Sequence, residues 1–297
     1  MHWYEIGAAL ISVAARLAGV AERTQVKSMS VHVVGAGALG SMIAARLSAA
    51  GVETRLVLRA KSGRWRAVDA TSRVRVLVDG APHDVATAPD ARDAKLVLLC
   101  TKVWQARDAL RQAKTSAKVV ALCNGALSLA DDATIVPAVT THGCFETQPF
   151  DVTHAGPGTL WVSDEEAFAT LSASETLNVV RVSEAEMTER LWKKLAVSCV
   201  LNPLTALHSC RNGEALPGRE ETCRAVCAEI ASLDDCPCTT PNLEEAIYQC
   251  VAENAACDSV RCSVVASSLA PCAIRPIAAR RSSPNSSRRS TSTHRSC

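Results

Sequence analysis

A glycine-rich loop between a strand and a helix constrains the fold of this chain more than any other feature. Val31–Val34 is a short apolar run typical of a buried strand, and it leads directly into Gly35-Ala-Gly-Ala-Leu-Gly40. The pattern of residues 41–50 predicts a helix, and residues 54–58 predict a second strand. This order of strand, loop, helix and strand predicts an α/β fold of the Rossmann type.

The spacing of the three glycines is that of a dinucleotide-binding loop. The first glycine permits a tight turn, the second lets the backbone approach a pyrophosphate, and the third allows the helix to pack closely on the strand. The helix N-terminus adds N–H groups and a partial positive charge. Glycines of an ordinary turn are the alternative. We expect cofactor contacts along the whole loop, at Gly35, Ala36, Gly37, Ala38, Leu39 and Gly40.

The end of the second strand indicates which dinucleotide is bound. Enzymes that use NAD commonly have Asp or Glu here, to bind the ribose hydroxyls. This chain has Arg59 instead, with Lys61 and Arg64 nearby. Because cations suit the 2′-phosphate of NADP, the sequence predicts NADPH as cofactor. A surface charge without a binding role is the alternative interpretation of Arg59.

The remaining patterns divide the chain into an α/β part and a helical part. Strands are predicted over residues 73–78, 96–100, 119–122 and 159–162, and helices over residues 105–113, 187–207, 222–233 and 242–256. We therefore expect an N-terminal extension over residues 1–28 and a Rossmann-type NADP-binding domain over residues 29–185. An all-α domain over residues 186–256 and a basic Ser/Arg-rich tail over residues 257–297, whose composition predicts disorder, follow. Met29 is an alternative start.

The bulk composition excludes several classes of protein. The 297 residues are 48% hydrophobic and carry a net charge of +2, which argues against a nucleic-acid or membrane partner. The 14 cysteines are scattered, without the paired spacing of a zinc site. We expect reduced thiols, no bound metal and a cytoplasmic location.

A stripe of polar side chains marks the first predicted helix of the all-α part. Lys194, Ser198 and Asn202 are four residues apart, so they lie on one helix face. An ammonium group can stabilise a negative oxygen and donate a proton to it. An amine and an amide on one face, together with a dinucleotide site, suggest a reductase. A surface lysine of an amphipathic helix is the alternative.

The chain resembles the ketopantoate reductase (2-dehydropantoate 2-reductase) family from about Val31 to Ala256. The resemblance is most specific in three places: Gly35–Ser41, Thr101-Lys-Val-Trp-Gln105 with Asn124-Gly125, and Leu191–Leu216. It implies a Rossmann domain followed by a helical domain like that of 6-phosphogluconate dehydrogenase. It also implies NADPH-dependent reduction of 2-dehydropantoate to pantoate, in pantothenate and coenzyme A biosynthesis, by a monomer or homodimer.

The resemblance assigns roles to matching residues. Lys194 corresponds to the proton donor, and Ser198 stands where the family usually has Asn, which implies weaker substrate binding. Substrate-binding positions correspond to Asn124, Ser198, Asn202, Asn212 and Asn254. Cofactor-binding positions outside the glycine loop correspond to Arg59, Lys102, Gln105, Asn124 and Cys144. His142 is interpreted as structural.

The resemblance stops after Ala256, which predicts a truncated helical domain. Cys257 replaces a substrate-binding serine of the family, and no Glu follows Glu253 where the family has a cofactor-contacting glutamate. Residues 257–297 contain seven Arg and one acidic residue. Either the tail is a genuine basic extension or the reading frame has shifted. Two alternatives therefore stay open: a reductase of another branched keto acid, and a non-catalytic NADPH-binding protein.

Overall fold

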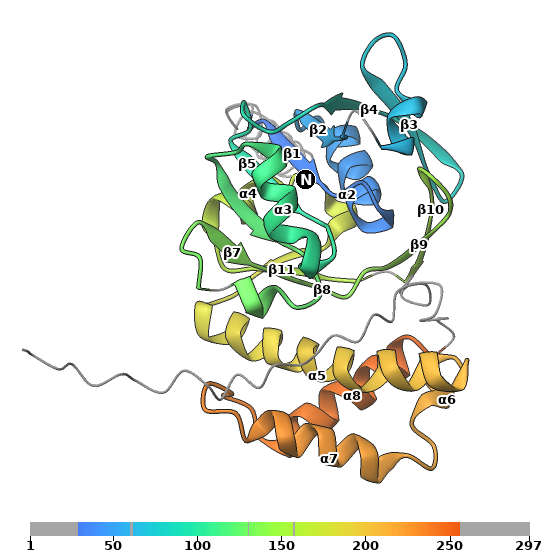
Figure 1. The fold of residues 1–297 in the computed structure, drawn as a ribbon, viewed down its shortest axis with the longest axis vertical. Helices are drawn as coiled ribbons and strands as arrows, with labels where there is room; N and C mark the ends of the chain where they lie inside the picture. The colour runs from blue at the N-terminus through green and yellow to red at the C-terminus, as the bar shows by residue number, and fades with distance from the viewer. Residues whose placement is uncertain (1–28, 60–61, 130, 157, 256–297) are drawn as a thin grey trace, which may run out of the picture. The chain divides into compact units, whose positions relative to one another are not determined.

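A computed structural model describes residues 29–59, 62–129, 131–156 and 158–255. Its main feature is a nine-stranded sheet (Figure 1). In spatial order the strands are β7 (Ile135–Pro137), β6 (Lys118–Ala121), β5 (Leu96–Leu99), β1 (Val31–Val34), β2 (Thr54–Val57), β4 (Ala81–Ala88), β3 (Arg73–Val78), β10 (Asp151–Gly156) and β9 (Gly143–Gln148). The ends of β5 and β6 differ from the predicted ends by no more than one residue.

The six strands from β7 to β4 are parallel and form a Rossmann-type sheet. β1 lies at its centre, where Val31 is in register with Thr54 of β2 on one side and Leu96 of β5 on the other. The chain order reverses at this point, because β2 follows β1 on one side and β5 continues on the other. Ligands of such sheets bind beyond the carboxyl ends of the strands at this reversal.

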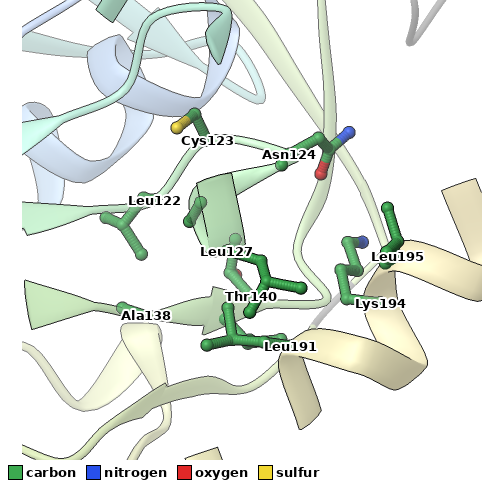
Figure 2. Close-up of a pocket in the computed structure, with 12 residues that line it drawn as sticks. Leu122, Cys123, Asn124, Leu127, Ala138, Thr140, Leu191, Lys194 and Leu195 are labelled. Carbon is green, nitrogen blue, oxygen red and sulfur yellow. The ribbon is translucent and has the colours of Figure 1, made fainter. Parts of the chain in front are cut away.

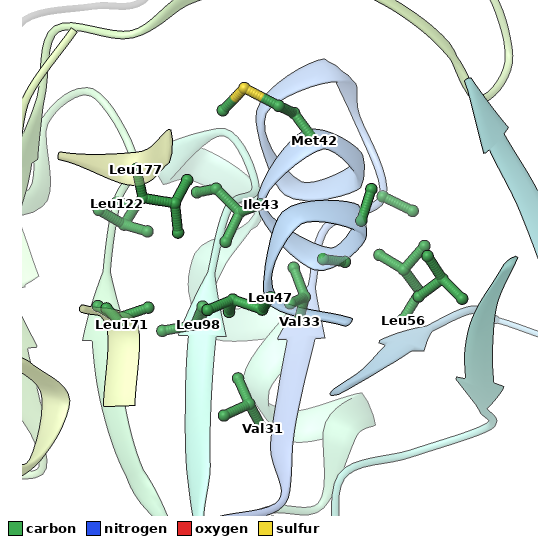
Figure 3. Close-up of a cluster of buried hydrophobic side chains, with 14 of the residues drawn as sticks. Val31, Val33, Met42, Ile43, Leu47, Leu56, Leu98, Leu122, Leu171 and Leu177 are labelled. Atoms are coloured by element: carbon green, nitrogen blue, oxygen red, sulfur yellow. The ribbon is translucent and has the colours of Figure 1, made fainter. Parts of the chain in front are cut away.

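Alternate residues of the central strands supply two separate cores. Val33 belongs to the cluster that contains α2 (Ala38–Ala49), in which Ile43 and Leu47 are buried (Figure 3). Val34 belongs to the cluster that contains Ala106 of α3 (Val103–Ala113). Because successive side chains of a strand point to opposite faces, α2 and α3 cover opposite faces of the sheet. This explains why the strands are continuously apolar.

Smaller elements complete the α/β part. A second sheet has the order β12 (Val179–Arg181), β11 (Leu160–Val162) and β8 (Val139–Thr140). The other short elements are α4 (Glu165–Leu171) and the 3-10 helices η1 (Gly63–Ala67), η2 (Ala126–Leu129) and η3 (Glu175–Leu177).

The helical part begins with α5 (Glu184–His208), which starts where its sequence provides a cap. The Ser183 side chain accepts from the backbone N–H of Glu186, and the Glu186 side chain accepts from that of Ser183. α5 packs with α6 (Asn212–Ala215), α7 (Glu220–Ala231) and α8 (Thr240–Glu253) around an aliphatic core that includes buried Cys223 and Cys227 (Figure 1). The predicted extension, the tail and Cys257 lie outside the described residues.

Candidate active site

The glycine loop after β1 has the geometry that a bound pyrophosphate requires. Gly35 adopts φ +111°, and a Cβ there would lie 2.7 Å from the backbone of Cys100 and Thr101. A Cβ on Gly40 would lie 2.0 Å from the carbonyl oxygen of Gly35. A Cβ on Gly37, in contrast, would have none of the described atoms within 4 Å. Two glycines are therefore needed for packing, and the middle one leaves open space beside the backbone.

The N-terminus of α2 is suited to an anion. Gly37 is the N-cap, so no side chain occupies the capping position, and the first turn carries no acidic residue. The N–H groups that begin the helix are therefore available to a phosphate. Nearby, Ser41 Oγ of α2 and Thr101 Oγ1, which follows β5, are buried and have no hydrogen-bond partner among the described residues. Open backbone space and unpaired hydroxyls fit a polar ligand that binds along this edge of the sheet.

The end of β2 presents one exposed cation and one paired cation. Arg59 follows the strand and is exposed. Arg64 of η1 donates two hydrogen bonds to the Glu146 carboxylate, at 2.9 and 2.5 Å, and its guanidinium lies 5.2 Å from the Phe150 ring centroid. Of the two arginines near the expected 2′-phosphate, only Arg59 is thus without an acidic partner in the described structure. Lys61 lies outside the described residues.

A pocket lies between α5 and the loop after β6 (Figure 2). Lys194 enters it from α5 beside Leu191 and Leu195, and Asn124 lies on the facing loop. Gly125 adopts φ +86°, and its Cα faces the Val103 side chain, so that loop packs against the start of α3. The strand β8 closes the pocket, together with the residue before it, through Ala138, Val139 and Thr140. An amine and an amide therefore meet at one mostly apolar pocket near the carboxyl end of β6.

The electrostatics of the pocket distinguish Lys194 from its neighbour. Burial lowers the pKa of the Lys194 ammonium, and nearby Cys250 of α8 acts in the opposite direction when its thiol is ionised. A lowered pKa makes an ammonium a stronger proton donor. Lys193 instead pairs with Glu189 at 2.6 Å, one turn earlier on the same helix. Lys193 is therefore a paired charge outside the pocket lining.

The other polar residues of the predicted site lie on α5, on α6 and at the end of α8, outside the pocket lining. Ser198 and Asn202 are half-buried, one and two turns beyond Lys194 on α5. Asn212 is buried at the start of α6. Asn254, the C-cap of α8, donates to the Cys250 carbonyl at 3.1 Å, and its Oδ1 lies 3.4 Å from where a Cβ on Gly156 would be.

A backbone hydrogen bond joins the end of α8 to α6. The Gly213 N–H donates to the Ala255 carbonyl at 3.1 Å, which joins α6 to the end of α8. Cys250 is four residues before Asn254, so both are on one face of α8. Cys250 was not among the predicted site residues, but its effect on the pKa of Lys194 places this face of α8 near the amine.

The remaining predicted cofactor residues lie near the carboxyl ends of the parallel strands or in the glycine loop. Lys102 is the N-cap of α3, and both Lys102 and Gln105 are exposed. Cys144 is half-buried on β9, where it packs against the core around α2. Ala36 is buried, and Ala38 and Leu39 are half-buried in the loop and first turn. The structure thus places these residues near the glycine loop or the Asn124 loop, with their contacts to a cofactor still a prediction.

Comparison with known proteins identifies the family. The family model for ketopantoate reductase PanE/ApbA matches residues 31–166, and the model for its C-terminal domain matches residues 186–266. The chain belongs to the ketopantoate reductase family. The second match continues to residue 266, ten residues past Ala256, where the resemblance was expected to stop.

Curated relatives agree with this membership. The chain is 31% identical to the 2-dehydropantoate 2-reductase of Halobacterium salinarum over 226 residues, which covers 67% of this chain and 73% of the relative. It is 30% identical to that of Yersinia pestis over 157 residues, covering 47% and 50%. For several such relatives the match spans about half to two thirds of their length.

Solved structures share the fold. A PanE/ApbA family ketopantoate reductase from Ralstonia eutropha aligns with a TM-score of 0.60 at 24% identity, covering 77% of this chain and 82% of that one. A D-mandelate dehydrogenase solved with NADH aligns with a TM-score of 0.61 at 19% identity, covering 75% and 79%. The expected Rossmann-type part followed by a helical part is confirmed.

Among the described helices, none combines the length and the apolar character of a membrane span.

Proposed function

We propose that this protein reduces 2-dehydropantoate to pantoate with NADPH, a step toward pantothenate and coenzyme A, in the cytoplasm. The observation that carries the proposal is the Lys194 ammonium, half-buried in a pocket opposite Asn124 and beside the carboxyl ends of the parallel strands. Family membership and the open backbone at Gly37 support it. The working unit is a monomer or a homodimer.

The residues of the site divide the reaction between them. A nicotinamide cofactor supplies the hydride when it is bound, and the hydride goes to the keto carbon of the substrate. Lys194 stabilises the negative charge that develops on the keto oxygen and donates the proton that completes the alcohol. Its lowered pKa favours this transfer, and solvent then returns the proton to the amine. Asn124 orients the substrate, since an amide both donates and accepts hydrogen bonds.

The polar groups beyond the pocket extend the substrate site. We assign Ser198, Asn202, Asn212 and Asn254 to the hydroxyl and carboxylate groups of the substrate. The shorter Ser198 side chain reaches the substrate through water, which weakens binding without removing the chemistry. Lys102, Gln105 and Cys144 contact the cofactor, together with the glycine loop and Arg59.

Replacing Lys194 tests the role of the amine. We expect Lys194→Ala to lower kcat by about 10²–10⁴-fold, the usual contribution of a positioned general acid, while NADPH still binds. Lys193→Ala is the matched control, because it removes the neighbouring ammonium, which is paired with Glu189. Steady-state kinetics with 2-dehydropantoate would measure both variants. Full activity of Lys194→Ala, or equal losses in the two variants, would remove Lys194 from its role.

A second candidate is the reduction of another branched or aromatic 2-keto acid. The specific observation in its favour is the structural likeness to D-mandelate dehydrogenase, at a TM-score of 0.61. A panel of 2-keto acids assayed with NADPH and NADH separates the two functions. A kcat/KM highest for 2-dehydropantoate supports the first function, and a clear preference for another acid supports the second. Binding of NADPH without turnover of any acid would support a non-catalytic role.

A further inference from the structure

Two histidines outside the pocket form a continuous hydrogen-bonded chain between four elements. Arg46 of α2 lies 2.8 Å from His154 Nδ1, and His154 Nε2 lies 3.0 Å from His142 Nδ1. At the far end, His142 Nε2 lies 2.9 Å from the carbonyl oxygen of Leu177 in η3. The Gly158 N–H also donates to His142 Nδ1, at 3.1 Å. His142 is buried, and His154 is half-buried.

The chemistry of the two ends fixes the direction of every bond in this chain. A guanidinium can only donate, so His154 Nδ1 accepts, and the proton of neutral His154 is on Nε2. That N–H donates to His142 Nδ1, and the Gly158 N–H shares the single lone pair of this nitrogen in a three-centre hydrogen bond. The proton of neutral His142 is then also on Nε2, where the Leu177 carbonyl accepts it. All contacts are satisfied when both rings are neutral.

A single added proton disrupts the chain wherever it binds. On His154 it would occupy Nδ1 and place an N–H against the donating guanidinium of Arg46. On His142 it would occupy Nδ1 and face the N–H groups of His154 and Gly158. Either event turns a donor–acceptor contact of the chain into a donor–donor contact, so the contact with Arg46, or those with His154 and Gly158, would be lost.

The charges around the pair act mainly against protonation. Burial lowers the pKa of both rings, and the positive charge of Arg46 lowers both further. A proton on His142 would also lower the pKa of His154. Asp79 accepts a hydrogen bond from the His154 backbone N–H at 2.8 Å, and both its charge and a hydrogen bond of the ring with the Gly156 backbone raise the pKa of His154. The Leu177 carbonyl raises the pKa of His142 in the same way.

The chain connects parts that the candidate site needs in fixed positions. Arg46 belongs to the helix that begins at the glycine loop. His142 lies between Thr140, which lines the pocket, and Cys144, a predicted cofactor contact. His154 is two residues before Gly156, against which the Asn254 side chain lies.

We propose that His142 and His154 are a proton-sensitive positioning pair, which holds the loop after β8 and the end of β10 against α2 only while both rings are neutral. Protonation of either ring would loosen these three parts together, so the stability of the α/β part and the geometry of the site would fall at mildly acidic pH. The consequence for turnover rests on the proposed function, whereas the positioning pair itself does not.

Two measurements on the full chain test the positioning pair. Long-range ¹H–¹⁵N spectra of histidine rings should find both His142 and His154 as the Nε2–H tautomer at pH 7.5. Thermal unfolding at pH 7.5 and 5.5 should then compare wild type with His142→Gln/His154→Gln, because a Gln amide keeps one acceptor and one donor but does not titrate in this range. We expect wild type to lose about 3 °C more than the double variant.

The controls separate this proposal from the proposed function. His208→Gln removes an exposed histidine outside the chain of hydrogen bonds and should keep the wild-type pH dependence. If the double variant fails to fold, the tautomers of the wild-type rings and His154→Gln alone provide the test. An Nδ1–H tautomer in either ring, or equal pH dependence in wild type and the folded variant, would overturn the positioning pair. A protein that shows the pair but reduces no keto acid would instead refute the proposed function.

Discussion

Alanine substitutions at two glycines of the same loop should affect different properties, stability at Gly40 and cofactor binding at Gly37. A Cβ on Gly40 would lie 2.0 Å from the Gly35 carbonyl oxygen and 3.1 Å from Cys100 Cβ, so α2 would have to move away from the strands. A Cβ on Gly37 would meet none of the described atoms within 4 Å, and the φ of −82° and ψ of −172° at this N-cap suit any residue. The first change is therefore a packing defect, and the second fills only the space kept for a ligand.

The magnitudes follow from these contacts. For Gly40→Ala, the clash is with backbone that cannot rotate away, so we expect a loss of about 3 kcal/mol, at the upper end of overpacking. This corresponds to a fall in Tm of about 6–12 °C. For Gly37→Ala, loss of a glycine N-cap costs less than about 1 kcal/mol of stability. Its cofactor Kd should rise at least about tenfold, because a methyl group would occupy the place of the pyrophosphate.

Thermal unfolding without ligand, together with NADPH titration followed by fluorescence, measures both quantities in each variant. The expected pattern is a stable Gly37→Ala protein that binds NADPH weakly, and an unstable Gly40→Ala protein. Gly80→Ala is a control outside the loop: its Cβ position is likewise open, and its φ of +80° should lower stability without changing NADPH affinity. Wild-type affinity in Gly37→Ala would refute the reasoning, because the open space would then have no part in cofactor binding.

Two further predictions concern single side chains. Arg59→Ala should weaken NADPH binding by about tenfold and leave NADH binding unchanged, since NADH lacks the 2′-phosphate that the exposed cation would contact. Parallel titrations with the two cofactors would show equal losses if Arg59 has another role. His32 is buried on β1 with Nε2 unpaired among the described residues, and burial lowers its pKa. The unfolded chain then binds more protons than the folded chain. The stability contributed by neutral His32 is therefore complete above about pH 6.5 and is lost as the pH falls through its folded pKa. Urea unfolding at several pH values should show that the free energy of unfolding falls less steeply with acid in His32→Leu than in wild type.

The parallel sheet and the helices could be predicted because their signals are local. Strands covered on both faces are continuously apolar, as in Leu96–Leu99. The predicted helix over 187–207 starts three residues later than observed α5, because the polar first turn precedes Met187, the first large apolar residue of the period. The predicted helices over 222–233 and 242–256 start two residues later than observed α7 and α8, because the first turns contain polar residues without an apolar period.

The edge of the sheet formed by β10 and β9 could not be predicted from local pattern. Gly143–Gln148 forms β9, an edge strand in which no residue is fully buried, so its sequence has no alternation of apolar and polar residues. Its pairing with β10, and that of β10 with β3, is set by contacts between distant segments. Arg64 and Glu146 are 82 positions apart, so their pairing could not be predicted from local sequence. Arg64 was therefore predicted as a cation near the cofactor.

The candidate site combines these two kinds of information. The stripe of Lys194, Ser198 and Asn202 follows from helix geometry alone, but which of the three faces the Asn124 loop depends on how α5 packs against β8 and η2. Only Lys194 of this stripe lines the pocket in the described structure, whereas Ser198 and Asn202 lie outside its lining. The lowered pKa of Lys194 arises from the same packing, because burial among these elements disfavours the charged amine. Helix periodicity therefore identifies the candidate residues, and tertiary packing places Lys194 in the pocket and lowers its pKa.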